Sequence, residues 1–205
     1  MANIFRARPD LCDGRYEQFC HYAAPMYSNI TSILLAHSQF SLLETMLKYW
    51  LPNRGTPESF WHHEWNKHGT CVNTLAPRCY SQGRADGDGE EAEPEEYKEG
   101  QELVDYFQRA VTLFSQLDTY TALVSAGITP STSRTYTNRE ISDALYKLTG
   151  APVVLGCDRG ALNQAWYAFN VRGNLQTGAF VASEPPGSGK GTCPERGIHW
   201  WPKDN

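Results

Sequence analysis

Residues 60–71 read Phe-Trp-His-His-Glu-Trp-Asn-Lys-His-Gly-Thr-Cys, and the interpretation of the whole chain starts from this stretch. Three histidines, one glutamate and one lysine fall within the seven residues from His62 to His68. The stretch has no proline, and its first glycine is Gly69. This pattern predicts a helix over residues 60–68 that ends at Gly69.

Helical spacing would place four ionisable side chains of this stretch on one face. His63 lies one turn before Lys67, and Glu64 lies one turn before His68, so the four fall within an arc of about 140°. Trp65 points away from that arc, toward a core. A histidine that titrates near neutral pH, beside a carboxylate and a cation, suits acid–base chemistry on a negatively charged substrate.

The same residues could also form a solvated helix face or a metal site. Histidine, lysine and glutamate are ordinary surface residues, but a solvated helix face does not explain the flanking aromatic residues and cysteine. A zinc site of the His-Glu-x-x-His type needs its two histidines four residues apart. His63 and His68 are five apart, which turns His68 about 100° past the position that four-residue spacing would give it on a helix. The spacing therefore argues against a metal site, and we expect no metal ligand and no cofactor.

The run from His63 to Cys71, with Phe60 and Trp61 ahead of it, resembles the second catalytic segment of the ribonuclease T2 family. The resemblance extends over about residues 9–203. It implies an α+β fold in which an antiparallel β-sheet packs with several α-helices. It also implies an endoribonuclease that cleaves single-stranded RNA through a 2′,3′-cyclic phosphate to a 3′-phosphate. Because the 2′-hydroxyl is the nucleophile in that reaction, DNA is not a substrate.

The resemblance also assigns a role to individual residues. His68 corresponds to the general base, and His63 corresponds to a residue that binds phosphate. Glu64 and Lys67 correspond to the groups that stabilise the pentacoordinate phosphate. Three further positions correspond to substrate-binding residues: Asp10 and Tyr16, which contact a base, and Phe60, which stacks on one in a neighbouring site.

The first catalytic segment of the family, His-Gly-Leu-Trp-Pro-Asp ahead of a cysteine, corresponds here to residues 5–12. Pro9, Asp10 and Cys12 match the family pattern, whereas Phe5 stands in place of the catalytic histidine and Arg8 in place of the tryptophan. We therefore expect an N-terminally truncated chain that lacks the N-terminal strand region of the fold. The alternative is a catalytically inactive relative that binds RNA or a nucleotide, or that interacts with another protein, because phenylalanine cannot transfer a proton.

Six cysteines without any Cys-x-x-Cys spacing predict a disulfide framework formed in an oxidising compartment. The family resemblance implies that Cys20 pairs with Cys71 and Cys157 with Cys193. It leaves Cys12 and Cys79 either as free thiols or as a pair. The sequence Asn29-Ile30-Thr31 is an acceptor for N-glycosylation. We expect a secreted, vacuolar or lysosomal-type glycoprotein, although residues 1–9 contain no apolar segment of a signal peptide.

Composition limits the remaining possibilities. A formal net charge of −5 argues against broad electrostatic binding to polynucleotides, and no apolar run approaches the ~20 residues needed to span a membrane. A chain of 205 residues can bury one substantial core, so we expect a single domain over residues 1–205 and a monomer. Residues 81–101 are acidic and glycine-rich, and their irregular oxygen spacing favours a solvated loop over a calcium site.

Helical and strand-like patterns divide the chain into two parts. Apolar residues recur at three-to-four spacing in four segments, which predicts helices over residues 30–34, 42–50, 103–117 and 137–149. Short β-rich runs follow at residues 152–157, 165–171 and 179–182. Helices first and strands later predict an α+β domain with an antiparallel sheet.

Overall fold

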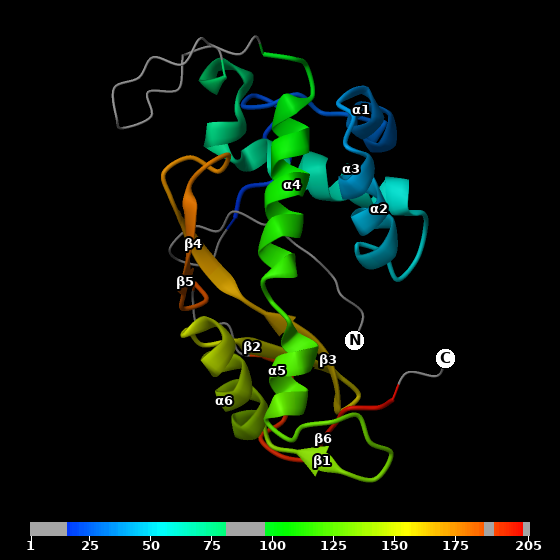
Figure 1. The fold of residues 1–205 in the computed structure, drawn as a ribbon, viewed down its shortest axis with the longest axis vertical. Helices are drawn as coiled ribbons and strands as arrows, with labels where there is room; N and C mark the ends of the chain where they lie inside the picture. The colour runs from blue at the N-terminus through cyan, green and yellow to red at the C-terminus, as the bar shows by residue number, and fades with distance from the viewer. Residues whose placement is uncertain (1–15, 81–96, 187–190, 203–205) are drawn as a thin grey trace.

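The structure is a computed structural model that describes residues 16–80, 97–186 and 191–202. The predictions that concern Phe5, Arg8, Asp10 and Cys12 therefore lie outside the described residues, as does most of the acidic loop. Figure 1 shows α1, α2 and α3 at one end of the molecule and β1, β6, α5 and α6 at the other, with α4 between them.

Among the described residues, five helices correspond to predicted ones and a sixth was not predicted. Four of the predicted helices are α1 (Ile30–Ala36), α2 (Phe40–Tyr49), α4 (Gln101–Ser115) and α6 (Asn138–Thr149), and the fifth carries the histidines. The unpredicted helix is α5 (Thr119–Ser125), which is only seven residues long and begins at an Asp118 cap. The side chain of Asp118 accepts a hydrogen bond from the Thr121 N–H, which lowers the pKa of the Asp118 carboxyl group.

The helix that carries the histidines is α3 (Pro57–Lys67), and it begins three residues earlier than predicted. Thr56 and Ser59 form a reciprocal capping box, and Pro57 occupies the first turn, where its missing N–H leaves no bond unmade. Three 3-10 turns follow at Gly69–Cys71 (η1), Asn73–Leu75 (η2) and Pro77–Cys79 (η3). The chain after α3 therefore stays compact until it reaches the acidic loop.

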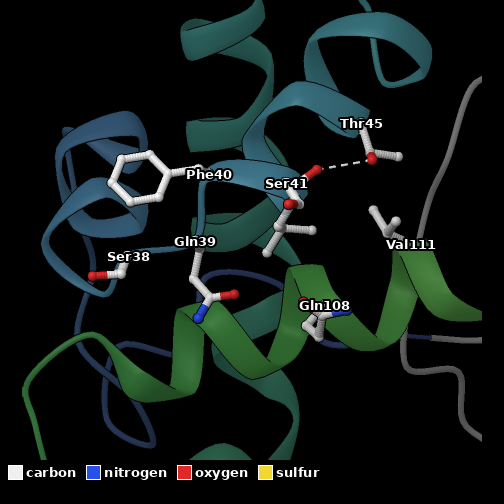
Figure 2. A pocket seen from close by; sticks show the side chains of 8 residues that line it. Ser38, Gln39, Phe40, Ser41, Thr45, Gln108 and Val111 are labelled. Carbon is white, nitrogen blue, oxygen red and sulfur yellow. Dashed lines mark hydrogen bonds between the residues drawn. The ribbon is translucent and has the colours of Figure 1, made fainter.

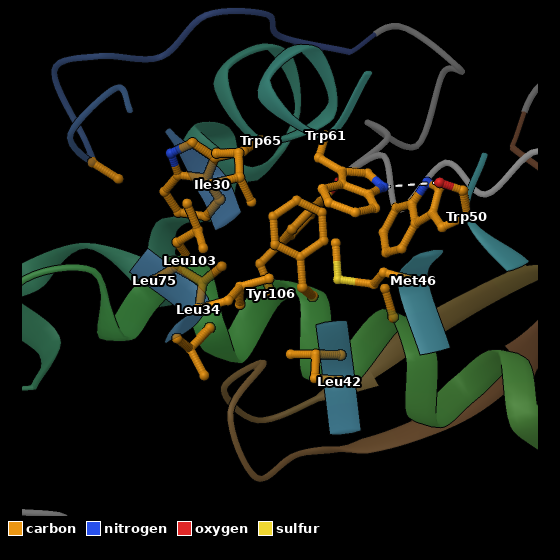
Figure 3. Close-up of a cluster of buried hydrophobic side chains, with 14 residues drawn as sticks. Ile30, Leu34, Leu42, Met46, Trp50, Trp61, Trp65, Leu75, Leu103 and Tyr106 are labelled. Atoms are coloured by element: carbon orange, nitrogen blue, oxygen red, sulfur yellow. Dashed lines mark hydrogen bonds between the residues drawn. The ribbon is translucent and has the colours of Figure 1, made fainter. Parts of the chain in front are cut away.

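The helical end of the molecule has its own hydrophobic core, built from α1, α2, α3 and α4 (Figure 3). Trp61 and Trp65 of α3 are almost completely buried in it. The indole N–H of Trp61 donates a hydrogen bond of 2.8 Å to the carbonyl oxygen of Trp50, and Trp50 packs edge-on against Phe107 of α4. The prediction that Trp65 points into a core is confirmed.

The other end of the molecule contains the main β-sheet, with strands in the order β1-β6-β3-β2. These strands are β1 (Thr135–Tyr136), β2 (Val154–Asp158), β3 (Ala161–Trp166) and β6 (Ile198–His199). β1 pairs antiparallel with β6, and β2 pairs antiparallel with β3, whereas β3 and β6 run parallel. Arg159 and Gly160 both have positive φ in the tight turn between β2 and β3, which suits a two-residue hairpin.

A separate two-stranded hairpin consists of β4 (Ala168–Arg172) and β5 (Ala179–Ser183). The predicted strand over residues 165–171 is thus split between β3 and β4, with Tyr167 at the break. The guanidinium group of Arg109, in α4, donates a hydrogen bond to the carbonyl oxygen of Gly178 and lies over the ring of Phe180. This contact fixes the hairpin to the long helix. The α+β class predicted from the sequence is confirmed.

Both disulfides expected from the family resemblance are present. Cys20 is bonded to Cys71 next to the end of α3, and Cys157 is bonded to Cys193 beside β2. Cys79 is a free, exposed thiol. Among the described residues, none of the helices is both long and apolar enough to cross a membrane.

Candidate active site

The candidate site forms where α3 ends. His63 and Glu64 lie in its last full turn, and His68 is the residue that caps the helix. The backbone of His68 has φ −117° and ψ −49°, away from ideal helical values, although its N–H still donates to the carbonyl oxygen of Glu64 at 3.1 Å. His68 therefore leaves the regular helical path that the spacing argument assumed.

This departure brings three side chains of the site together. Among the described residues, His63, Glu64 and His68 each offer a nitrogen or carboxylate oxygen, and these atoms all lie within 4.8 Å of one another. The imidazole rings of His63 and His68 are 6.2 Å apart between centroids and nearly perpendicular. The expectation that five-residue spacing keeps these two histidines apart is wrong, because it applied helical rotation to a residue at the helix end.

The three clustered residues differ in exposure. Glu64 and His68 are buried, at 1% and 2% of full exposure, whereas His63 is exposed. Lys67 is the last residue of α3 and is half-buried. The site thus has a desolvated floor formed by Glu64 and His68, and an exposed histidine at its edge.

The predicted substrate-binding residues lie in different surroundings. Tyr16 is half-buried, and its ring is 5.6 Å from that of His68 at an angle of 46°, so the structure brings it to the cluster. Phe60 is partly buried against the helical core, one turn before Glu64 on α3. Asp10 lies outside the described residues. Sequence alone could not separate a packing role for Tyr16 from a substrate role, and the contact with His68 places it at the site.

The segment of residues 16–27, which carries Tyr16, is tied closely to the end of α3. The Phe19 N–H donates to the carbonyl oxygen of Lys67 at 3.1 Å, and the Cys20 N–H donates to the Thr70 hydroxyl at 3.0 Å. The Trp65 indole N–H donates to the carbonyl oxygen of Pro25 at 3.0 Å. Together with the Cys20–Cys71 disulfide, these bonds hold the 16–27 segment in a fixed position beside the histidines.

Asn66 is a further component of the site that the sequence analysis did not assign. It is 99% buried between Glu64 and His68, and its side-chain amide bonds to the backbone of Tyr27 in both directions. The Tyr27 hydroxyl in turn donates to the buried carboxylate of Glu102 in α4, at 2.6 Å. Asparagine is a poor helix former because its amide competes for backbone bonds, but Asn66 is the next-to-last residue of α3, so its position in the sequence gave no signal of this role.

Burial shapes the electrostatics around the site. Burial raises the pKa of the Tyr106 hydroxyl well above its ordinary value, and the nearby Glu64 carboxylate raises it further. Burial also raises the pKa of Tyr27, and the Glu102 carboxylate that accepts its hydrogen bond adds to the effect. Both phenols therefore stay neutral and act as hydrogen-bond donors beneath α3.

A separate pocket of about 240 Å³ lies between the start of α2 and α4 (Figure 2). Phe40, Ser41 and Thr45 of α2 and Gln108 and Val111 of α4 line it. None of its lining residues carries a charge, and none belongs to the cluster of His63, Glu64 and His68. The chemistry of the molecule therefore has to be sought at the end of α3.

The α+β fold, with two histidines and a buried glutamate at the end of one helix, defines a protein with a candidate acid–base site. Comparison with known proteins identifies the class. The Ribonuclease T2 family model matches residues 7–180, and the chain belongs to the ribonuclease T2 family.

The similarity to individual members of the family is extensive. The chain is 47% identical over 195 residues to a ribonuclease T2-like protein of Aspergillus fumigatus, covering 95% of this chain and 44% of that protein. It is 45% identical to ribonuclease Trv of Hypocrea rufa, covering 95% of this chain and 76% of that enzyme. The crystal structure of the T2 ribonuclease Actibind superimposes with a TM-score of 0.84 at 44% identity, covering 97% of this chain and 78% of that one. The chain thus spans less than half the length of the Aspergillus fumigatus relative.

Proposed function

We propose that this protein is an endoribonuclease that cleaves single-stranded RNA by transphosphorylation. The 2′-hydroxyl attacks the adjacent phosphorus as its proton passes to a base, and the 5′-oxygen leaves with a proton that water supplies, because Phe5 stands at the position of the family's acid. Water then hydrolyses the resulting 2′,3′-cyclic phosphate to a 3′-phosphate. The observation that carries the proposal is the gathering of His63, Glu64 and His68 within 4.8 Å at the end of α3. The reaction needs a base, and it needs groups that stabilise added negative charge on phosphorus.

The proposed roles follow from the burial of each group. His68 takes the proton of the 2′-hydroxyl, since its ring is held in a buried position that does not have to reorganise. Glu64 and Lys67 stabilise the pentacoordinate phosphate, and exposed His63 binds a phosphate oxygen at the edge of the site. Burial strengthens the interactions of Glu64 and His68, because little water competes for their contacts with the substrate.

Base binding is proposed for the aromatic residues that flank the cluster. Tyr16 lies beside the His68 ring, and Phe60 keeps part of its ring exposed on the same helix. Aromatic faces stack on any base, which fits an enzyme without strong sequence preference. Asp10 is proposed to contact a base as well. Solved relatives include RNase NT in complex with 5′-AMP and an RNase MC1 mutant in complex with 5′-GMP, at 22% and 21% identity, which supports a nucleotide as the ligand of this site.

The experiment compares the purified chain with His68→Ala on a single-stranded RNA and on a DNA of the same sequence, in EDTA at mildly acidic pH. We expect cyclic-phosphate products from RNA only, and a loss of roughly 100- to 10,000-fold in His68→Ala. His37→Ala is the matched control, because His37 lies between α1 and α2 and contacts the backbone of Glu99. Equal rates in wild type and His68→Ala would refute the assignment of the base.

The second candidate is a T2-like protein that binds RNA or nucleotides without cleaving them. The observation that favours it is Phe5, which stands where the family pattern has its first catalytic histidine. Under this alternative, the chain binds 5′-AMP in calorimetry and releases no cyclic phosphate from RNA. We also propose that the protein is a monomeric glycoprotein of a secreted or vacuolar compartment, with RNA as its partner.

A further inference from the structure

Phe19, in the segment of residues 16–27, has a backbone conformation that phenylalanine seldom adopts. Its φ is +54°, in the left-handed region where a Cβ atom crowds the backbone and glycine is the usual residue. Among the described residues other than glycine, only Ser38 and Arg159 also have a positive φ, and both are polar residues of turns. A bulky apolar side chain at such a position suggests a function, since glycine would fit the same backbone without strain.

Hydrogen bonds on both sides of Phe19 maintain the strained conformation. The Phe19 N–H donates to the carbonyl oxygen of Lys67 at 3.1 Å. The Phe19 carbonyl oxygen accepts two hydrogen bonds from His21, one from the backbone N–H at 2.9 Å and one from Nδ1 of the ring at 3.1 Å. The next residue, Cys20, is bonded to Cys71. Phe19 therefore cannot relax to an ordinary conformation without breaking these contacts.

The side chain that this backbone carries is not part of a core. Phe19 is 45% exposed, and it belongs to none of the hydrophobic clusters that the described residues form. Tyr22, in the same segment, is 70% exposed, and its hydroxyl donates to the Glu17 carboxylate at 3.0 Å. The segment thus presents two aromatic rings to solvent on a backbone that is held in place, which lowers the entropy lost when a ligand binds.

This aromatic surface continues from the candidate active site. Tyr16, three residues before Phe19, lies beside the His68 ring, and the backbone of Phe19 is bonded to Lys67, the residue before His68. We propose that Phe19 stacks on a base of single-stranded RNA, one nucleotide beyond the two whose bases lie at Tyr16 and Phe60. This inference rests on the proposed function, because RNA has to occupy the candidate site for its next base to reach Phe19.

The chemistry of the segment selects the base of that nucleotide as the group that is bound. An aromatic ring stacks on the flat face of any base, whatever the sequence. Glu17 is exposed in the same segment and repels a phosphate, whereas Lys67 attracts phosphates at the candidate site. The third nucleotide is therefore held by its base, and the protein should prefer RNA of three or more nucleotides to a dinucleotide.

The test measures how affinity depends on the length of the RNA. 2′-O-methyl RNA lacks the nucleophile of the reaction, so it binds without being cleaved. The probes are one dinucleotide and the two trinucleotides that extend it at its 5′ or its 3′ end, and calorimetry gives the ratio of trinucleotide to dinucleotide affinity. For one of the two trinucleotides we expect a ratio of roughly fivefold or more in the wild type, the low end of what stacking on one base contributes. Phe19→Ala should lose most of this gain.

Phe19→Gly separates a contact with RNA from a structural effect. Glycine adopts a φ of +54° without strain, so this variant should unfold at a higher urea concentration than Phe19→Ala, which keeps the strained Cβ atom. Both variants lack the ring, and both should show the same low affinity ratio despite their different stabilities. Phe40→Ala is the matched control, because Phe40 is an exposed phenylalanine at the start of α2 and should leave the ratio as it is in the wild type.

Three results would overturn the inference: a wild type that binds neither trinucleotide more tightly than the dinucleotide, a gain that survives in Phe19→Ala, or a gain that returns in Phe19→Gly. Cleavage of RNA decides the proposed function separately. A chain that cleaves RNA and shows no gain with length would refute the third base site and leave the ribonuclease standing. A gain that depends on Phe19 in a chain that releases no cyclic phosphate would refute the ribonuclease and leave the base site standing.

Discussion

The side-chain amide of Asn66 forms two hydrogen bonds with the backbone of Tyr27, one as acceptor and one as donor. The Tyr27 N–H donates to Oδ1 of Asn66 at 2.9 Å, and Nδ2 of Asn66 donates to the Tyr27 carbonyl oxygen at 2.8 Å. Because Asn66 lies in α3 between Glu64 and His68, this pair sets where the end of α3 sits relative to the 16–27 segment. Tyr27 is also stacked on Trp65 and bonded to Glu102 of α4, so the pair connects the site to the helical core.

We expect Asn66→Leu to lower stability and to disturb the site. The substitution keeps the branching of the side chain but leaves the Tyr27 N–H and carbonyl group without these partners, which costs about 1–3 kcal/mol for partly buried groups. Tyr27→Phe is the matched comparison, because it removes the bond to Glu102 and keeps both bonds to Asn66. Urea unfolding should show similar losses for the two variants, whereas the NMR signals of the His63 and His68 rings should shift only in Asn66→Leu. Unchanged ring signals in Asn66→Leu would show that the pair does not position the histidines.

The two disulfides make a second matched pair. They close chain segments with sequence separations of 51 and 36 residues, for which loop entropy predicts a similar stabilisation of about 4 kcal/mol each. Only the Cys20–Cys71 bond joins the 16–27 segment to the end of α3. Replacing both cysteines of either bond by alanine should therefore lower the free energy of unfolding by similar amounts, as measured in urea.

Their effects on the site should differ. At a temperature where both double variants are folded, the one lacking Cys20–Cys71 should lose affinity for 5′-AMP in calorimetry, because Tyr16 is no longer held against His68. The variant lacking Cys157–Cys193, beside β2, should bind as the wild type does. Equal losses of 5′-AMP affinity would mean that the effect comes from general destabilisation.

Gly69 is required by close packing against an indole ring. A Cβ atom at this position would lie 2.3 Å from Cε3 of Trp65, which is fully buried and cannot move aside freely. We expect Gly69→Ala to destabilise the protein by about 1–3 kcal/mol through overpacking and to change tryptophan fluorescence. Gly127→Ala is the contrast: its Cβ has open space, and only the backbone φ of +76° is unfavourable. Both variants should lose stability, and a fluorescence change in Gly127→Ala alone would contradict the packing argument.

Periodicity in the sequence was sufficient to predict the long elements and insufficient for the short ones. The fifteen residues of α4 show a complete apolar face, whereas β1 and β6 contain two residues each, too few for any alternation. The parallel pairing of β3 with β6 depends on contacts between residues about forty apart, such as Ala161 and His199, which local sequence does not encode. The missed break at Tyr167 has the same origin: the strand run is continuous in sequence and is divided by pairing.

The candidate site was likewise predictable only in part. The identity of its residues was evident from one short stretch, because the histidines, the glutamate and the cysteine are adjacent in the chain. Their arrangement was not, since it depends on His68 leaving the helix and on Asn66 bonding to a residue 39 positions away. The end of a helix is where rotation by a fixed angle per residue no longer applies, so the expected separation of His63 and His68 failed there.

Alkaline pH should destabilise the junction between the acidic loop and α4. Tyr97 donates a hydrogen bond of 2.9 Å to the buried carboxylate of Glu102. Burial, and then the Glu102 carboxylate, raise the pKa of Tyr97 from its ordinary value of 10.0 to about 12. Between these two values the unfolded chain loses the proton while the folded chain retains it. Stability from this group is therefore fully present below pH 10 and is lost as the pH rises toward 12.

The measurement compares urea unfolding of the wild type and Tyr97→Phe at pH values below and within that window, in short exposures that spare the disulfides. Tyr97→Phe should be less stable at neutral pH, because it leaves Glu102 with one donor fewer. Its stability should also fall less steeply above pH 10, because the titrating group is gone. Tyr146→Phe, at an exposed position of α6, should follow the wild type throughout. A steeper fall in Tyr97→Phe than in the wild type would assign the alkaline transition to the other buried phenols, Tyr27 and Tyr80, whose pKa values are also raised by burial.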